Sequence, residues 1–209
     1  MTVEKNRTIR VKRILIFGMM FLFAGGTAFG GSMLYQPEEE TLIRNTIMVL
    51  AGTGIVIYAY LVSEAMGLFL YRNEGKYGKF AFVYLVSLAA AVFFPVLPVT
   101  GWPFLVLFVL LGVFSNSVTG MAAGSVCLLL AVNFSGGDMT IFWLYFISGL
   151  TGILVFSNLN DDFLVGMPVI ISLLVLLLCL AANIVLFSKD PLKLDQFTIP
   201  ALNLMVCCV

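Results

Sequence analysis

The chain has 209 residues, of which 61% are hydrophobic and 11% are charged, whereas an average soluble domain has about 25% charged residues. This composition places the chain among membrane proteins. Eleven basic residues balance eleven acidic ones, so no net charge favours a nucleic acid as partner. The sequence has no histidine, which removes the commonest general base and metal ligand.

Continuous apolar runs predict an all-α, polytopic transmembrane helical bundle, because the strands of a barrel would alternate apolar and polar residues. We expect about eight spans, an anchor helix followed by seven more. The last run has only 12 residues, whereas a spanning helix needs about 20, so we expect the eighth span to be incomplete. The segment FFPVLPVTGWP carries three prolines and is predicted to be a loop or a broken helix. The predicted spans are Ile14–Tyr35, Asn45–Tyr71, Phe80–Pro95, Trp102–Ser115, Val118–Phe134, Thr140–Phe156, Phe163–Phe187 and the run from Thr198.

Lysines and arginines predict the orientation. Residues 1–13 hold five basic residues and one acid, QPEEETLIR holds three glutamates, and RNEGKYGK holds three basic residues. The positive-inside rule therefore predicts a plasma-membrane protein with a cytoplasmic N-terminus and cytoplasmic residues 72–79. The expected organisation is a basic N-terminus (1–13), an anchor helix (14–35), a short extracellular loop (36–44) and a seven-helix membrane domain (45–209). The first span is too long for a typical signal peptide, so we favour an uncleaved anchor.

Few residues are candidates for a site. Glu64 is the only ionisable residue well inside a predicted span, and such residues often have a function. Its alternative role is an ion pair near the cytoplasmic interface. Asn183 is the most interior asparagine and could line a ligand cavity or form a helix–helix hydrogen bond. The pairs Gly26-x-x-x-Gly30 and Gly120-x-x-x-Gly124 are predicted helix-packing positions.

No motif indicates catalysis. The sequence contains no phosphate-binding loop, nucleophile elbow or paired carboxylates within one predicted site. The cysteines all lie in apolar runs without a C-x-x-C pair, which is typical of buried thiols. We therefore expect no catalytic residue, metal or cofactor. The expected partner is the lipid bilayer, with a homo-oligomer or another membrane protein as further candidates. The four cysteines are Cys127, Cys179, Cys207 and Cys208.

One part of the sequence resembles a known family. The run FFPVLPVTGWPFLVLFVLLGVFSNSVTGMAAG, then NFSGGDMTIFWLYFISGLTGILVF and the span through LCLAANIVL, resembles the membrane region of the seven-transmembrane HD phosphohydrolases, the PgpH-type cyclic-di-AMP phosphodiesterases. The resemblance covers roughly residues 55–209. It implies a signalling protein of the bacterial inner membrane, with an anchor helix, an extracellular domain, seven spans and a cytoplasmic HD domain.

The chain departs from that family in three ways. Only QPEEETLIRN stands where the family has a large extracellular domain, the turn SNLNDDF is acidic where the family has arginines, and the histidines of an HD domain are absent. The expected function is therefore a sensory or anchoring membrane module without catalysis of its own, in which an enzyme domain would belong to a longer parent protein. The alternatives are a structural membrane protein resembling MreD and a substrate-binding membrane subunit of a vitamin transporter.

Overall fold

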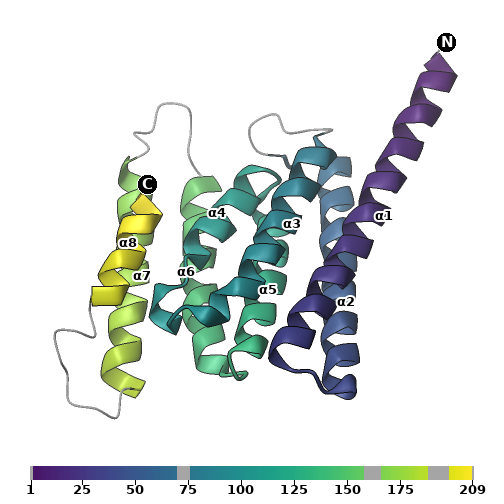
Figure 1. Cartoon of the computed structure of the whole chain (residues 1–209). Coiled ribbons are helices and arrows are strands. Elements are labelled where there is room, and N and C mark those ends of the chain that lie inside the picture. Colours follow the sequence, from purple (N-terminus) through teal and green to yellow (C-terminus); the bar gives the residue numbers. More distant parts are fainter. Residues whose placement is uncertain (1, 70–75, 158–165, 188–197, 209) are drawn as a thin grey trace.

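A computed structural model describes residues 2–69, 76–157, 166–187 and 198–208, and it leaves the side chains of residues 2–10, 157, 166–169, 183–187, 204 and 208 undescribed. These residues form α-helices and two short 3-10 turns, η1 and η2. Consecutive α-helices run in opposite directions, so the start of α1 and the start of α3 lie at the same end of the bundle (Figure 1). The elements are α1 (Thr2–Tyr35), α2 (Glu39–Ala65), α3 (Tyr77–Phe93), η1 (Phe94–Val96), η2 (Val99–Gly101), α4 (Phe104–Val113), α5 (Ser117–Phe134), α6 (Met139–Ser157), α7 (Gly166–Phe187) and α8 (Thr198–Cys208).

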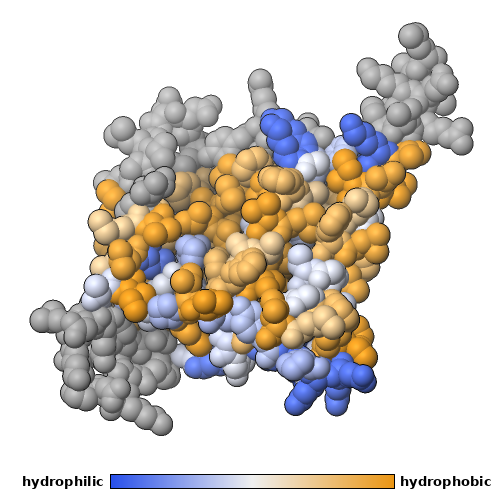
Figure 2. Space-filling model, viewed as in Figure 1, coloured by the Kyte–Doolittle hydropathy of each residue, from blue (hydrophilic) through white to orange (hydrophobic). Residues whose placement is uncertain are grey.

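The expectation of an all-helical, membrane-like bundle is confirmed for the described residues. Five segments are long and apolar enough to cross a membrane. Figure 2 shows apolar side chains across the middle of the viewed face and hydrophilic ones at both ends of the bundle. Three further apolar helices are shorter in their described parts, so the number of eight spans stays a prediction. The five segments are Val11–Tyr35, Glu39–Ala65, Tyr77–Val96, Ser117–Phe134 and Met139–Phe156.

The boundaries of α2 correct two predictions. The predicted extracellular loop 36–44 is helical from Glu39 onwards, because two glutamates in the first turn complement the positive end of the helix dipole. The helix ends at Ala65 instead of Tyr71. Gly67 has a φ of +66°, which ordinary side chains rarely adopt, and its N–H donates to the Glu64 carbonyl at 3.2 Å. A helix that ends on such a glycine cannot continue.

The proline-rich segment is a broken helix, as one of the two predicted possibilities had it. α3 ends at Phe93, the chain makes η1 and η2, and α4 begins at Phe104. Prolines lack the backbone N–H that a longer helix would need here. Around the break, the rings of Phe94, Trp102, Phe104 and Tyr145 pack together with centroid separations from 4.9 to 6.5 Å. This aromatic cluster buries the break against α6.

The helix α5 lies at the centre of the packing, in contact with α1, α2, α3, α4 and α6. Two glycines allow it to approach α4. A Cβ at Gly120 would lie 2.5 Å from the Cα of Gly112, and a Cβ at Gly124 would lie 2.6 Å from the ring of Phe108. The structure thus places Gly120 and Gly124 at a close helix contact, as the sequence predicts.

Gly26 and Gly30, the other predicted packing positions, do not pack against another helix in the described part of this chain. A Cβ at either position would meet no atom within 4 Å, because both face away from the bundle. The neighbouring glycines face inwards instead. A Cβ at Gly25 would lie 3.0 Å from Leu50 of α2, and one at Gly31 would lie 2.7 Å from Phe134 of α5. The rotation of α1 about its axis decides which glycines pack, and a helix that is apolar on all sides does not reveal that rotation.

Candidate functional site

An ion pair joins the first two helices. The Arg13 guanidinium of α1 donates from Nη2 to Oε2 of Glu64 on α2. The two side chains are 29% and 22% exposed, so the pair is partly buried. The guanidinium carbon of Arg13 also lies 5.9 Å from the ring centroid of Phe17, within the range of a cation–π contact. The pair lies at the end of the bundle where α3 begins.

Aromatic rings pack beside this ion pair. Tyr60, one turn before Glu64, is fully buried and stacks on Phe80 of α3 with centroids 4.8 Å apart. Its ring also meets Phe17 of α1 edge-on at 5.7 Å. The Tyr60 hydroxyl and the Arg13 Nε are buried without a hydrogen-bond partner. The ring contacts fix α1, α2 and α3 together, and the two polar atoms leave the local hydrogen bonding incomplete.

A second polar group lies at the opposite end of α1 and α2. Asn45 of α2 is 1% exposed, and its Nδ2 donates to Ser32 Oγ at 3.1 Å and to Gln36 Oε1 at 3.0 Å. Its Oδ1 accepts from Asn133 Nδ2 of α5 at 2.7 Å, and Gln36 Nε2 donates to the Asn133 carbonyl at 2.9 Å. Both amide hydrogens and the amide oxygen of Asn45 are therefore used. An amide with this set of partners joins three helices and is not available to a ligand.

A third polar contact holds the proline-rich break. Asn203 of α8 is 2% exposed, and its Nδ2 donates to the carbonyl of Thr100 at 2.9 Å and of Trp102 at 3.1 Å. The Tyr145 hydroxyl of α6 donates to the Val99 carbonyl at 2.5 Å. Irregular backbone within an apolar bundle needs such partners, because lipid offers none. α8 therefore satisfies carbonyls that the broken helix leaves open.

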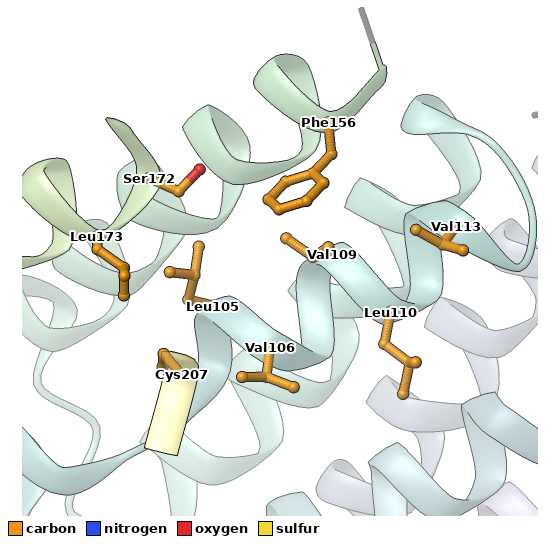
Figure 3. A pocket seen from close by; sticks show the side chains of 9 residues that line it. All are labelled: Leu105, Val106, Val109, Leu110, Val113, Phe156, Ser172, Leu173 and Cys207. Carbon is orange, nitrogen blue, oxygen red and sulfur yellow. The ribbon is translucent and has the colours of Figure 1, made fainter. Parts of the chain in front are cut away.

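One apolar cavity lies between α4, α6, α7 and α8. Its volume is about 190 Å³. Figure 3 shows side chains from all four helices around it, with the Ser172 oxygen turned towards α6. The Ser172 hydroxyl is buried without a hydrogen-bond partner. The lining side chains are Leu105, Val106, Val109, Leu110, Val113, Phe156, Ser172, Leu173 and Cys207.

The predicted candidates are not brought together. Glu64 has the helix–helix polar contact that was one of its two predicted roles, and the cavity residues do not include it. Asn183 belongs to α7, but its side chain lies outside the described residues. Among the residues described, no group of three or more Cys, Asp or Glu side chains could hold a metal ion.

Sequence reasoning missed several polar residues that organise the bundle. Asn203 stands within a largely apolar stretch and Asn45 lies at the start of one, and an amide in such a position can signal a helix–helix hydrogen bond. Ser172 gives no signal in the sequence, because serine occurs often in apolar helices. Arg13 was assigned to the basic N-terminus, and its pairing with Glu64 required the direction of α1 relative to α2.

Comparison of the chain with models of known protein families, with curated protein sequences and with solved structures found no match.

Proposed function

We propose that this chain is a multi-pass membrane module that anchors or senses, and that it does not itself catalyse a reaction. The observation that carries the proposal is the use of its interior polar groups. Arg13 pairs with Glu64, and Asn45 and Asn203 bind other helices or the broken backbone. A catalytic site needs an acid or base that is free to meet a substrate, whereas these groups hold helices together.

The orientation is part of the proposal. Arg13 and the first turn of α3, which includes Lys79, lie at one end of the bundle, and Glu39 and Glu40 begin α2 at the other end. Positive residues favour the cytoplasmic side of a membrane. The N-terminus and the start of α3 are thus cytoplasmic, and the start of α2 is outside.

The enzymatic activity that this module serves is the hydrolysis of a cyclic dinucleotide by a separate HD domain. This step rests on the resemblance of the sequence of residues 55–209, which includes FFPVLPVTGWP, to the membrane region of the HD phosphohydrolases. In that role the module conveys a signal from the membrane to a cytoplasmic HD domain, supplied by a longer parent protein or by a partner. The cavity described above gives less support to a vitamin-binding subunit, because Ser172 and Cys207 supply its only polar side-chain atoms.

Two assays test the function together. Purified chain in lipid nanodiscs should not hydrolyse cyclic di-AMP in the presence of Mn²⁺, because it has no histidine for an HD metal site. Membranes from cells that lack the chain should differ from wild-type membranes in cyclic di-AMP hydrolysis. Unchanged hydrolysis together with a cell-shape defect would favour the structural role resembling MreD. Turnover by the pure chain would contradict the proposal directly.

A further inference from the structure

The cavity between α4, α6, α7 and α8 lies towards one end of the bundle. Two of the lining residues lie at helix ends: Val113 is the last residue of α4, and Phe156 is the last but one of α6. Ser172 lies about two turns into α7, which starts at this same end. In a membrane the cavity would therefore belong largely to the half of the bundle where α7 begins, with Ser172 about 9 Å along α7 from its first residue.

The chemistry of the cavity restricts its occupant. None of its lining residues is charged, and apart from Ser172 and Cys207 they are all aliphatic or aromatic. A cavity of about 150 Å³ with similar walls is large enough to bind benzene, and this one is about 190 Å³. Ile170 and Leu174 of α7 are 57% and 54% exposed next to Ser172 and Leu173, so the nearby surface is apolar too. The occupant is thus neutral and apolar over most of its length.

The Ser172 hydroxyl adds one polar requirement. It is 1% exposed and has no hydrogen-bond partner, and a buried hydroxyl in that state costs about 1–3 kcal/mol. An apolar side chain from a second protein would fill the space but would leave the hydroxyl unpaired. An ester carbonyl on an alkyl chain supplies both the missing acceptor and the apolar volume.

We propose that this cavity binds one acyl chain of a membrane glycerolipid, with the ester carbonyl accepting a hydrogen bond from Ser172 Oγ. The bilayer supplies this occupant at high local concentration. The inference needs only that the bundle lies in a membrane, so it holds or fails independently of any link to cyclic-dinucleotide hydrolysis. Cys207 lines the cavity one turn after Asn203, so the bound chain also touches the helix that holds the proline-rich break.

Photo-crosslinking tests the site. The purified chain is reconstituted in nanodiscs that contain a phosphatidylglycerol with a diazirine in its acyl chain, and labelled residues are mapped by mass spectrometry. We expect labelling concentrated on residues 105–113 and 172–173. Val106→Trp at the cavity wall should reduce this labelling at least fivefold, and Leu110→Trp serves as a second filling variant if the first does not fold. Ile147→Trp is the matched control, because the Ile147 side chain of α6 is 50% exposed and does not line the cavity.

Ser172→Ala separates the hydrogen bond from the apolar fit. It should reduce labelling by the ester lipid about fivefold, the factor expected for one net hydrogen bond. Labelling by an ether-linked analogue, which lacks the carbonyl, should not change. Any of five results would overturn the proposal. Two concern the pattern: uniform labelling of the bundle surface, or labelling that neither filling variant affects. The other three are equal effects of Ser172→Ala on the two lipids, preferential labelling by a free diazirine fatty acid, and crosslinks from the cavity to a second copy of the chain.

Discussion

Arg13 and Glu64 form an ion pair across the contact of α1 with α2, although 51 positions separate them in the sequence. The pair connects the beginning of α1 to the last turn of α2. Because consecutive helices run in opposite directions, these two segments lie at the same end of the bundle. A carboxylate that would be costly in lipid thus meets a cation from the basic N-terminal segment.

A charge-reversal cycle tests this pair. Arg13→Glu or Glu64→Arg places two like charges together, and each should lower the free energy of unfolding by about 1–2 kcal/mol, since exposed pairs contribute up to about 1 kcal/mol and unpaired buried charges cost more. The double variant restores opposite charges and should recover at least half of the loss. Thermal unfolding in detergent measures this, with Lys12→Glu as the control for net charge. A double variant no more stable than the weaker single variant would contradict the pairing.

The polar group around Asn45 predicts an effect of similar size. Asn45→Leu keeps most of the side-chain volume but removes three hydrogen bonds, one each to α1, to α5 and to Gln36 just after α1. At about 0.6 kcal/mol for each such contact in a membrane, we expect a loss of about 2 kcal/mol. Denaturation of the reconstituted chain measures the loss. Thr46→Val is the neighbouring control, because Thr46 Oγ1 bonds only to the Leu42 carbonyl of its own helix. Equal stability of the two variants would show that Asn45 does not join the helices.

The contact of α4 with α5 depends on a missing side chain. Gly120→Ala would place a Cβ against the backbone of Gly112, which cannot move as a flexible side chain could. We expect a loss of about 1–3 kcal/mol, as for other overpacked positions. Gly26→Ala has open space and should be neutral or stabilising by up to about 1 kcal/mol, because alanine favours a helix. The same unfolding assay compares the two. If Gly26→Ala is the more harmful, then α1 packs through Gly26 and the corrected assignment is mistaken.

The sequence was sufficient to predict the helices but not their faces. Long apolar runs without alternation permit only helices in a membrane, so the starts of α5 and α6 were predicted to within one residue. The end of α2 was missed because one left-handed residue, Gly67, stops the helix within an apolar stretch. Uniformly apolar helices also conceal which side is buried, so Gly26 was chosen where Gly25 packs.

The polar contacts show the same limit. The sequence showed that Glu64 needs a partner near the interface, but the cation that meets it comes from a helix distant in the sequence. Asn203 lies in the short run from Thr198 that was predicted to be an incomplete span. Its two backbone acceptors belong to the segment between α3 and α4. Contacts of this kind depend on the three-dimensional arrangement, which local pattern does not determine.

Asn203 gives a further prediction for the proline-rich break. Asn203→Leu leaves the carbonyls of Thr100 and Trp102 without this donor, so the break should loosen. The fully buried Trp102 then reports the change. In a Trp143→Phe background, we expect a red shift of the Trp102 emission and stronger quenching by a water-soluble quencher. Asn203→Gln, which retains the amide, should lie closer to wild type. Emission that stays identical in Asn203→Leu would show that α8 does not hold the break.

The orientation of the bundle underlies the whole account, and labelling in intact cells tests it most directly. Single cysteines are introduced at Glu39 or at Gly78, both exposed, in a variant whose four native cysteines are replaced by alanine. A membrane-impermeant maleimide is then applied before and after permeabilisation. We predict that Glu39→Cys reacts in intact cells and that Gly78→Cys reacts only after permeabilisation. Reaction of Gly78→Cys in intact cells, with Glu39→Cys protected, would contradict the cytoplasmic N-terminus and the membrane module built on it.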